Sequence, residues 1–345
     1  MTGVSRATRC AVLLAAVGRA VARKSDSALQ CMDGSGNPVD YWYILKHPNG
    51  FEYSYADNKK TDLSTPSGGL DADTSPLSKT LKQAYESGVA YAMWNDEDPD
   101  DKSVSALSAH AKGVIAFLQD GGFWLTHSEP KFPPPVSEGF SWQTASEKYG
   151  QSFLCLTVGL DALETVGKVM ATNWPHVYDS NTPSFASKVS NFASWISNKH
   201  QRSAPDTQDT TVETVGGKSF RVFGKNKAFN SDLYSDLVAA NLGQALYTET
   251  WQNGRGDLPA SCGKTDVLSI DGLSVGGETW KNSQDHSKWA VTDDGKTVCF
   301  GDVNRQSGQF KRGGGTICSE VDLAKVLRGA ITSSQSCSDA GVIVV

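Results

Sequence analysis

Two histidine-x-lysine tripeptides, one in each half of the 345-residue chain, have the residue types and spacing best suited to chemistry. The first is His110-Ala111-Lys112 and the second is His286-Ser287-Lys288. A spacing of two along an extended strand places His and Lys on the same face, side by side. Two such pairs would supply a nucleophile, a general acid and two cations for phosphate oxygens, which predicts cleavage of a phosphodiester.

A single tripeptide of this kind is weak evidence, because a histidine near a strand edge is more often an ordinary surface or core residue. The occurrence of the tripeptide in two copies favours a functional role over that ordinary explanation. Each copy is followed by an apolar run, an Asp/Gly turn and a second apolar run, a pattern that predicts a hairpin. The apolar runs cover 114–118 and 123–125 after the first tripeptide, and 289–291 and 298–300 after the second.

The composition suits a folded chain with a large core. Of the residues, 39% are apolar and 20% are charged, which allows one wide domain or two pseudo-symmetric halves. The net charge of −6 and the pI near 5.5 argue against a permanently basic nucleic-acid-binding surface at neutral pH. Below the pI the carboxylates and the six histidines take up protons, so a polyanion would be bound mainly in acid.

The elements that must position the two tripeptides are helices and hairpins. Apolar residues at helical spacing predict helices over 77–90, 185–196 and 232–245. The polar stretch 201–216 predicts a loop or an edge strand, and the three prolines after Phe132 predict a rigid bend. Helices that alternate with hairpins in both halves predict an α/β or α+β fold.

The first 28 residues have the features of an imperfect signal peptide. Arg6 and Arg9 precede an apolar stretch, 10–17, that is too short to span a bilayer, and cleavage is expected near Ala28. No later segment has the pattern of a membrane helix, so no membrane partner is expected. The chain then divides into an amino-terminal half, 29–170, and a carboxy-terminal half, 171–345, each with one tripeptide.

Cysteine usage indicates an oxidising compartment. Removal of the signal peptide takes away Cys10 and leaves six of the seven cysteines, an even number that suits three disulfides. A metal site is disfavoured, because no cysteine pair has CxxC spacing and no histidine lies near a cysteine. No asparagine begins an N-glycosylation acceptor. We therefore expect a secreted or periplasmic protein of bacterial type, or a lysosomal one if the source is eukaryotic.

Longer motifs resemble the deoxyribonuclease II family, and the likeness covers nearly the whole chain after residue 30. The mature start carries Cys31-Met32-Asp33 and Gly36-Asn37-Pro38-Val39-Asp40-Tyr41-Trp42. The other motifs are Asp120-Gly121-Gly122-Phe123-Trp124-Leu125, His127-Ser128, Phe132-Pro133-Pro134-Pro135, Asp285-His286-Ser287-Lys288-Trp289, Gly301-Asp302-Val303-Asn304-Arg305 and Arg312-Gly313-Gly314-Gly315-Thr316.

The resemblance implies a fold similar to the phospholipase D superfamily. In that fold two pseudo-symmetric halves, each a mixed β-sheet flanked by helices, contribute one HxK each to a shared active site. The resemblance also implies an acid endonuclease that cuts DNA, needs no divalent metal or other cofactor and leaves 3′-phosphate ends. It permits a homodimer.

Site roles follow from the same resemblance. The candidate catalytic residues, which match the family's two HxK motifs, are His110, Lys112, His286 and Lys288. His127 matches a further histidine close to the family's site, and Asn304 stands where the superfamily keeps an asparagine that contacts phosphate. Residue 111 is Ala where the family usually has Thr. Because it points away from the His/Lys face, we expect the difference to affect packing and not chemistry.

The implied reaction has two steps. A neutral histidine attacks phosphorus and forms a phosphohistidine, while the other histidine, protonated, gives its proton to the departing 5′ oxygen. Water activated by the second histidine then releases the 3′-phosphate. The need for one neutral and one charged imidazole explains an acid optimum. Superfamily precedent favours His110 as the nucleophile.

The resemblance also selects one disulfide pattern from the fifteen that six cysteines permit. The implied pairs are Cys31 with Cys155, Cys262 with Cys337, and Cys299 with Cys318.

Other interpretations stay open. The segment Arg312-Gly313-Gly314-Gly315 suits a backbone phosphate nest and a tight turn before Cys318 equally well. We expect most of the nine tryptophans in the core, and no role for His47, His176 or His200, which we place on turns or facing solvent. The alternative functions are a phosphodiesterase for RNA or a phospholipid, and an inactive relative that binds nucleic acid. A metallonuclease is disfavoured, because no His/Asp cluster has ligand spacing.

Overall fold

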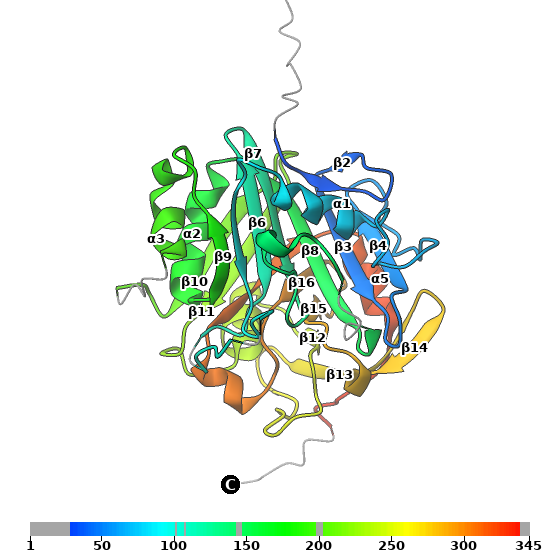
Figure 1. Ribbon diagram of the computed structural model, residues 1–345. Coiled ribbons are helices and arrows are strands. Elements are labelled where there is room, and N and C mark those ends of the chain that lie inside the picture. Colours follow the sequence, from blue (N-terminus) through cyan, green and yellow to red (C-terminus); the bar gives the residue numbers. More distant parts are fainter. Residues whose placement is uncertain (1–27, 101, 107, 143–146, 198–202, 339–345) are drawn as a thin grey trace, which may run out of the picture.

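The computed structural model describes residues 28–100, 102–106, 108–142, 147–197 and 203–338. The expected signal peptide and His200 lie outside these residues, apart from Ala28. Two large β-sheets form the centre of the molecule, and helices pack at their flanks (Figure 1). The fold is mixed α+β, which confirms the predicted class.

The first sheet has seven strands, and every neighbouring pair is antiparallel. In spatial order the strands are β4 (Tyr53–Asp57), β3 (Tyr41–Lys46), β8 (Gln151–Val158), β7 (Gly121–His127), β6 (Gly113–Leu118), β5 (Ala90–Trp94) and β9 (Val177–Asn181). Side chains alternate between its two faces, and both faces are buried. In β8, Leu154 and Leu156 join the core shared with the second sheet, whereas Phe153 and Cys155 join the opposite core.

The second sheet has nine strands, and its only parallel pair among those described is β12 with β13. In spatial order the strands are β10 (Thr207–Glu213), β11 (Ser219–Lys225), β17 (Gly314–Glu320), β16 (Thr297–Gly301), β15 (Trp289–Thr292), β12 (Leu246–Glu249), β13 (Val267–Val275) and β14 (Glu278–Lys281), with β18 (Ile331–Ser334) also paired to β13. The chain changes sheet between β9 and β10. This is later than the division at 170/171 expected from the sequence, because β9 returns to pair with β5.

The predicted hairpins are present in both sheets. Strands β6 and β7 pair antiparallel from Gly113 opposite Thr126 to Leu118 opposite Gly121. Strands β15 and β16 pair from Trp289 opposite Phe300, and their turn includes Gly295 at φ 66°, a left-handed conformation that favours glycine. The two tripeptides thus lead into central strands of the two sheets.

The helices are shorter than their apolar patterns predicted. Their bounds are α1 (Pro76–Lys82), α2 (Ala162–Asn173), α3 (Ser190–Ile196), the π-helix η5 (Tyr234–Ala239), α4 (Ala240–Leu242) and α5 (Leu323–Ala330). The predicted helix 77–90 stops at Lys82, where the chain passes into the short 3-10 helix η1 (Gln83–Tyr85) and becomes extended at Glu86. The predicted helix 232–245 stops at Gly243, which adopts a left-handed conformation. Helix α2 was not predicted. The polar stretch 201–216 contains the edge strand β10.

The largest core lies between the sheets and is completed by α2, α3 and α5. At its centre the rings of Tyr43 from β3 and Phe300 from β16 lie 4.9 Å apart. Such a pair adds about 0.5–1.5 kcal/mol beyond the burial of its surface. Figure 1 shows α2 and α3 at one side of the sheets and α5 at the other. None of the described helices has the length and apolar character needed to cross a membrane.

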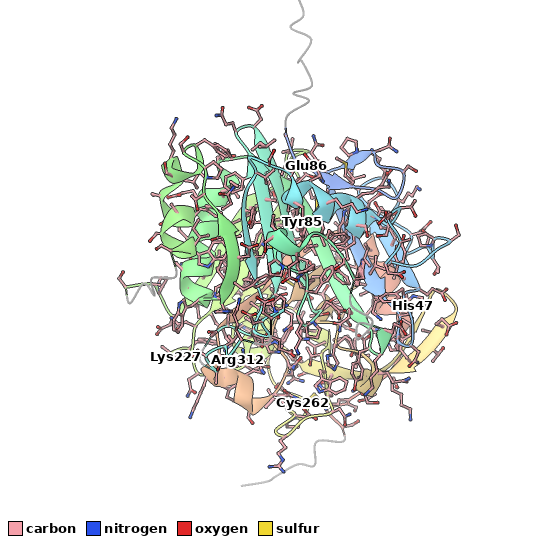
Figure 2. The ribbon with its side chains drawn as sticks, viewed as in Figure 1. His47, Tyr85, Glu86, Lys227, Cys262 and Arg312 are labelled. Carbon is pink, nitrogen blue, oxygen red and sulfur yellow. A yellow bond between two sulfur atoms is a disulfide. The ribbon has the colours of Figure 1, made fainter. Side chains whose placement is uncertain are left out.

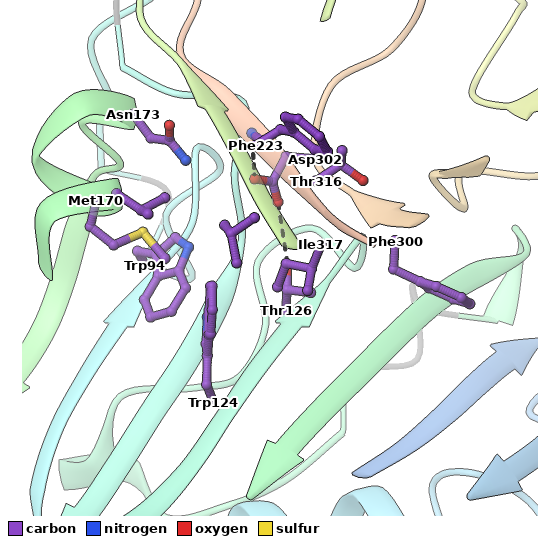
Figure 3. Close-up of a pocket in the computed structure, with 13 residues that line it drawn as sticks. Trp94, Trp124, Thr126, Met170, Asn173, Phe223, Phe300, Asp302, Thr316 and Ile317 are labelled. Carbon is purple, nitrogen blue, oxygen red and sulfur yellow. Dashed lines mark hydrogen bonds between the residues drawn. The ribbon is translucent and has the colours of Figure 1, made fainter. Parts of the chain in front are cut away.

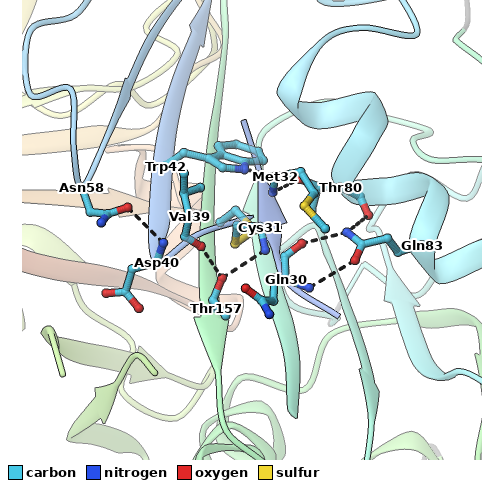
Figure 4. Close-up of a disulfide and its surroundings, with 11 residues drawn as sticks. Gln30, Cys31, Met32, Val39, Asp40, Trp42, Asn58, Thr80, Gln83 and Thr157 are labelled. Atoms are coloured by element: carbon cyan, nitrogen blue, oxygen red, sulfur yellow. Dashed lines mark hydrogen bonds between the residues drawn. A yellow bond between two sulfur atoms is a disulfide. The ribbon is translucent and has the colours of Figure 1, made fainter. Parts of the chain in front are cut away.

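The six cysteines form Cys31–Cys155, Cys262–Cys337 and Cys299–Cys318, the pairing that the family resemblance implied. The first bridge fastens β1 (Cys31–Met32) to β8. Around it, the Cys31 N–H donates to Thr157 Oγ1 at 3.0 Å, and that hydroxyl donates to the Val39 carbonyl at 2.6 Å (Figure 4). The beginning of the described chain is thereby attached to a central strand.

Candidate active site

The two tripeptides lie in the chain immediately before β6 and β15, and contacts between the two parts of the molecule hold both of them. His110 Nδ1 donates to the Asp302 carbonyl at 2.6 Å, and the His110 N–H donates to the Gly313 carbonyl at 2.9 Å. In the opposite direction, the His286 N–H donates to the Gly150 carbonyl at 2.8 Å. The Lys288 N–H donates to Ser152 Oγ at 3.0 Å. Each tripeptide is therefore positioned by residues from the other sheet.

Asp96, in the loop after β5, contacts two cations of the site, Lys112 and Arg312, and the His110 ring. Its carboxylate accepts hydrogen bonds from Lys112 Nζ and, at 2.9 Å, from Arg312, and it lies 3.9 Å from His110 Nε2. Burial alone would raise the pKa of Asp96, but the charges of Lys112, His110 and Arg312 outweigh it and hold that pKa well below its usual range. Asp96 is consequently a fixed negative charge facing the first tripeptide.

The chain before β17 places Arg312 in this network. The buried ammonium of Lys225 donates to the main-chain carbonyls of Gln309 at 2.9 Å, Phe310 at 3.2 Å and Arg312 at 2.7 Å, which fixes the turn. The Arg312 guanidinium then donates to the carbonyls of Ser108 and Ala109, just before the first tripeptide. Arg312 is labelled in Figure 2. From the sequence we considered the backbone of 312–315 as a phosphate nest. In the structure it is the Arg312 guanidinium that reaches the site.

Asp302, whose carbonyl accepts from His110, is itself held by hydrogen bonds to its carboxyl. Its buried carboxyl accepts from the Gly315 N–H at 3.0 Å and from Thr126 Oγ1 at 3.3 Å (Figure 3). Burial raises the pKa of Asp302 to about 7, against the opposing effects of the Gly315 hydrogen bond and the Lys112 charge. A cavity of about 20 Å³ between the sheets adjoins this carboxyl and is large enough for about one water molecule.

The His110 imidazole is held uncharged in the free protein. Burial lowers its pKa to about 3, and the positive charges of Lys112, Lys288 and Arg312 act in the same direction. The negative charge of Asp96 opposes them. Because Nδ1 donates to a carbonyl, the neutral ring must carry its proton there and leave Nε2 with a free lone pair.

His286 lies among aromatic rings. Tyr149 stacks on it with centroids 4.3 Å apart and an interplanar angle of 13°, and Trp251 meets it at 4.0 Å and 66°. Lys148 covers the Tyr149 ring at 4.7 Å. Burial lowers the pKa of His286 to about 3, aided by the charges of Lys288, Lys112 and Lys148. Sequence reasoning missed this aromatic setting, because the three rings come from separate segments.

Lys288 is buried and donates from Nζ to the His286 carbonyl at 2.6 Å. Burial lowers its pKa to about 7, and the neighbouring charge of Lys112 adds to that effect. Lys112 acts on the pKa of both His286 and Lys288, so the two tripeptides share one electrostatic environment. Close by, burial and the charge of Asp285 raise the pKa of the fully buried Glu249 far above its ordinary value, so this carboxyl is neutral.

The two supporting residues predicted from the sequence lie at the edges of the site. The His127 ring packs between Phe132 and Phe153, with centroids 5.7 and 5.8 Å away, and burial lowers its pKa to about 3. Its connection to the site runs through the main chain, where the His127 N–H donates to the Lys112 carbonyl at 3.2 Å. Asn304 is buried two residues beyond Asp302, and its side-chain oxygen has no hydrogen-bond partner among the described residues.

The remaining sequence expectations have mixed outcomes. Ala111 belongs to the core between the sheets, as its alternation with the His/Lys face predicted. His47, expected at a solvent-facing turn, is instead buried, because its Nε2 pairs with Ser54 Oγ at 2.9 Å and its ring packs 5.1 Å from Trp280. His176 is partly exposed and lies 3.5 Å from Asp98.

The site therefore combines two imidazoles, two lysines and an arginine at the junction of two sheets. Neutral and protonated imidazole can act as nucleophile and general acid, and the cations can stabilise a pentavalent phosphate. The fold is α+β, and the chain before a central strand of each sheet carries one of the two tripeptides.

Comparison with known proteins identifies the family. The family model described as deoxyribonuclease II matches residues 30–337. The chain is 33% identical to plancitoxin-1 of Acanthaster planci, over 91% of this chain and 94% of that protein. It is 33% identical to deoxyribonuclease-2-alpha of Rattus norvegicus, over 90% and 95%, and 32% identical to deoxyribonuclease-2 of Caenorhabditis elegans, over 90% and 95%. The chain belongs to the deoxyribonuclease II family.

Proposed function

We propose that this protein is an endonuclease that hydrolyses DNA phosphodiesters in acid, without a divalent metal, and leaves 3′-phosphate ends. The proposal is supported by two hydrogen bonds between distant parts of the chain, from His110 Nδ1 to the Asp302 carbonyl and from the Lys288 N–H to Ser152 Oγ. Family membership supports the choice of DNA as the substrate.

The proposed chemistry uses groups of this chain alone. One imidazole attacks phosphorus to form a phosphohistidine, and the other gives a proton to the departing 5′ oxygen. Lys112, Lys288 and Arg312 neutralise the growing charge on the phosphate oxygens, since each is a cation at the working pH. Asn304 is proposed to contact the phosphate, and His127 to support Lys112 through its main chain.

The working environment follows from the same features. Three disulfides support residence in an oxidising compartment, either outside the cell or in a lysosome. An acidic compartment would also protonate surface carboxylates and so reduce the repulsion between DNA and a chain of net charge −6.

Plasmid digestion across pH with excess EDTA, followed by end-group analysis, tests the proposal. We expect nicking and linearisation that survive chelation, increase on the acid side of neutrality and yield 3′-phosphate ends. Loss of cleavage on chelation that added magnesium restores, or 5′-phosphate ends, would refute it. Parallel incubations with RNA and phosphatidylcholine separate DNA cleavage from the other phosphodiesterase activities of this class.

A further inference from the structure

Two lysines outside the tripeptides, Lys46 and Lys225, are buried at matching places in the two sheets. We propose that both are positioning residues. Each binds the main chain of a segment of its own sheet, and that segment contacts the histidine of the tripeptide that leads into the other sheet. The proposal rests on the phosphodiesterase function proposed for the same site.

The two lysines end matching strands. The order β3-β8-β7-β6-β5 in the first sheet has the same antiparallel pairing as the order β11-β17-β16-β15-β12 in the second. Lys46 is the last residue of β3 and lies opposite Gln151, the first residue of β8. Lys225 is the last residue of β11 and lies opposite Gly314, the first residue of β17. Each lysine therefore lies beside the segment that leads into the neighbouring strand.

Both ammonium groups bind main-chain carbonyls. Lys225 makes three such hydrogen bonds to the turn before β17. Lys46 also makes three, to the carbonyls of His47 at 3.0 Å, Gly50 at 2.8 Å and Glu147 at 3.2 Å. Three carbonyls use all three N–H donors of an ammonium, so the buried charge is compensated by oriented dipoles that it holds in place.

Both lysines keep their charge in acid. Burial lowers the pKa of each to about 8, which lies above the pH range in which the site is proposed to act. Around Lys225, the charge of Asp232 favours protonation and that of Arg312 opposes it. The charged groups around Lys46 all favour its protonation, and they are Glu129, Asp285 and Glu147.

The segment bound by Lys46 contacts His286, which belongs to the other tripeptide. The Gly150 carbonyl accepts from the His286 N–H at 2.8 Å, and the Tyr149 ring stacks on the imidazole with centroids 4.3 Å apart. A side chain at residue 150 would collide with the Asp285 carboxylate, so the two parts of the chain approach closely here. Through this segment Lys46 fixes the position and plane of the His286 ring.

The segment bound by Lys225 contacts His110 in a corresponding way. The Gly313 carbonyl accepts from the His110 N–H at 2.9 Å, and the Arg312 guanidinium donates to the Ala109 carbonyl at 3.2 Å. Both glycines directly precede the first residue of a strand, β8 in one sheet and β17 in the other. The two lysines therefore act across the junction, each on the tripeptide that leads into the opposite sheet.

Hydrogen exchange at the two histidine amides tests this crossed arrangement without a substrate. In Lys46→Met we expect the His286 amide to exchange about tenfold faster and the His110 amide to keep its wild-type rate, because only the segment that holds His286 is loosened. Lys225→Met should give the reverse pattern. The rates are measured by NMR in acid on the full chain labelled with ¹⁵N.

Kinetics separate positioning from the loss of a charge. We expect each methionine variant to lose about 10- to 100-fold in kcat on a short DNA duplex in EDTA, with KM within about threefold of wild type, since a displaced histidine impairs the transition state more than binding. Lys218→Met removes a partly exposed lysine that donates to the Glu320 carbonyl, and it should keep both constants. Leu327→Ala, in the core on α5, should lower Tm and keep the kcat of the folded protein.

The proposal is overturned if exchange accelerates equally at both histidines or at neither. A wild-type kcat in folded Lys46→Met or Lys225→Met, or a loss that Lys218→Met shares, also overturns it. If a methionine variant does not fold, arginine at the same position repeats the test, because a planar guanidinium keeps the charge but cannot direct its donors at all three carbonyls. If the wild-type protein does not cut DNA, the endonuclease proposal fails, while the exchange rates still decide whether the lysines hold the histidines.

Discussion

The pH dependence of DNA cleavage can be worked out from the ionisation of the site. The pKa values of His110 and His286 are each lowered to about 3 by burial and nearby cations, while turnover requires one of the two rings to be protonated. Above a pKa of about 3, the protonated fraction rises about tenfold for each unit by which the pH falls. We therefore expect kcat/KM to rise by roughly 100-fold between pH 7 and pH 5.

Lys288 changes the profile near neutrality. Its pKa is lowered to about 7, so at pH 7 about half of the molecules lack this phosphate-neutralising charge. Below pH 7 Lys288 becomes fully protonated, which adds about a factor of two to the expected rise in kcat/KM. Bound phosphate raises the pKa of both histidines, so the profile of kcat should lie at higher pH than that of kcat/KM, which reports the free protein.

The assay is initial-rate cleavage of a short labelled duplex between pH 3 and pH 8, in EDTA and at constant ionic strength. The salt concentration must be fixed because binding to DNA phosphates depends strongly on it. A kcat/KM that is flat between pH 7 and pH 5, or that is highest above pH 7, would refute the requirement for a protonated histidine in this buried site.

Three further predictions concern the scaffold. Arg305→Met leaves the buried Asp232 without its 3.3 Å partner, and we expect a loss of about 3–5 kcal/mol, or roughly 4–8 °C in Tm by calorimetry. An unchanged Tm would contradict this. On folding, the pKa of the His127 ring falls from 6.5 to about 3. The folded protein therefore loses stability as the pH falls through that range, because the unfolded chain binds a proton that the folded protein does not. His127→Phe should therefore unfold at a lower pH than the wild-type protein and still cut DNA. Inactivity of the folded variant would instead show that the ring takes part in catalysis. Peptide mapping without reduction should find Cys299 joined to Cys318 and no free thiol among the six paired cysteines, and alkylatable thiols in the folded protein would refute the bridges.

The elements around the tripeptides could be predicted because their signals are local. Apolar runs on either side of an Asp/Gly turn were enough to locate the hairpins β6/β7 and β15/β16. Helix lengths could not be predicted as well, because tertiary constraints end the helices. The helix predicted over 77–90 ends at Lys82, and Ala90, its predicted last residue, instead begins β5, which pairs with β6.

Parts of the site could not be predicted because they depend on contacts between distant segments. Asp96 lies in an acidic stretch that the sequence does not distinguish from a solvated loop, and only the fold brings it to Lys112 and Arg312. The aromatic contacts of His286 likewise join Tyr149 and Trp251 across more than a hundred residues of chain. The HxK residues themselves were recognisable, since two residues of fixed spacing carry that signal.

The most direct test of the central claim compares the two histidines in one double-mutant cycle on DNA. Residues that act as one catalytic unit have strongly non-additive effects. We expect His110→Ala and His286→Ala each to abolish turnover to a similar extent, the double variant to be scarcely worse than either, and the control His200→Ala to stay active. A folded His110→Ala or His286→Ala protein that cleaves DNA at near the wild-type rate, with the loss falling on His200→Ala instead, would contradict the shared site.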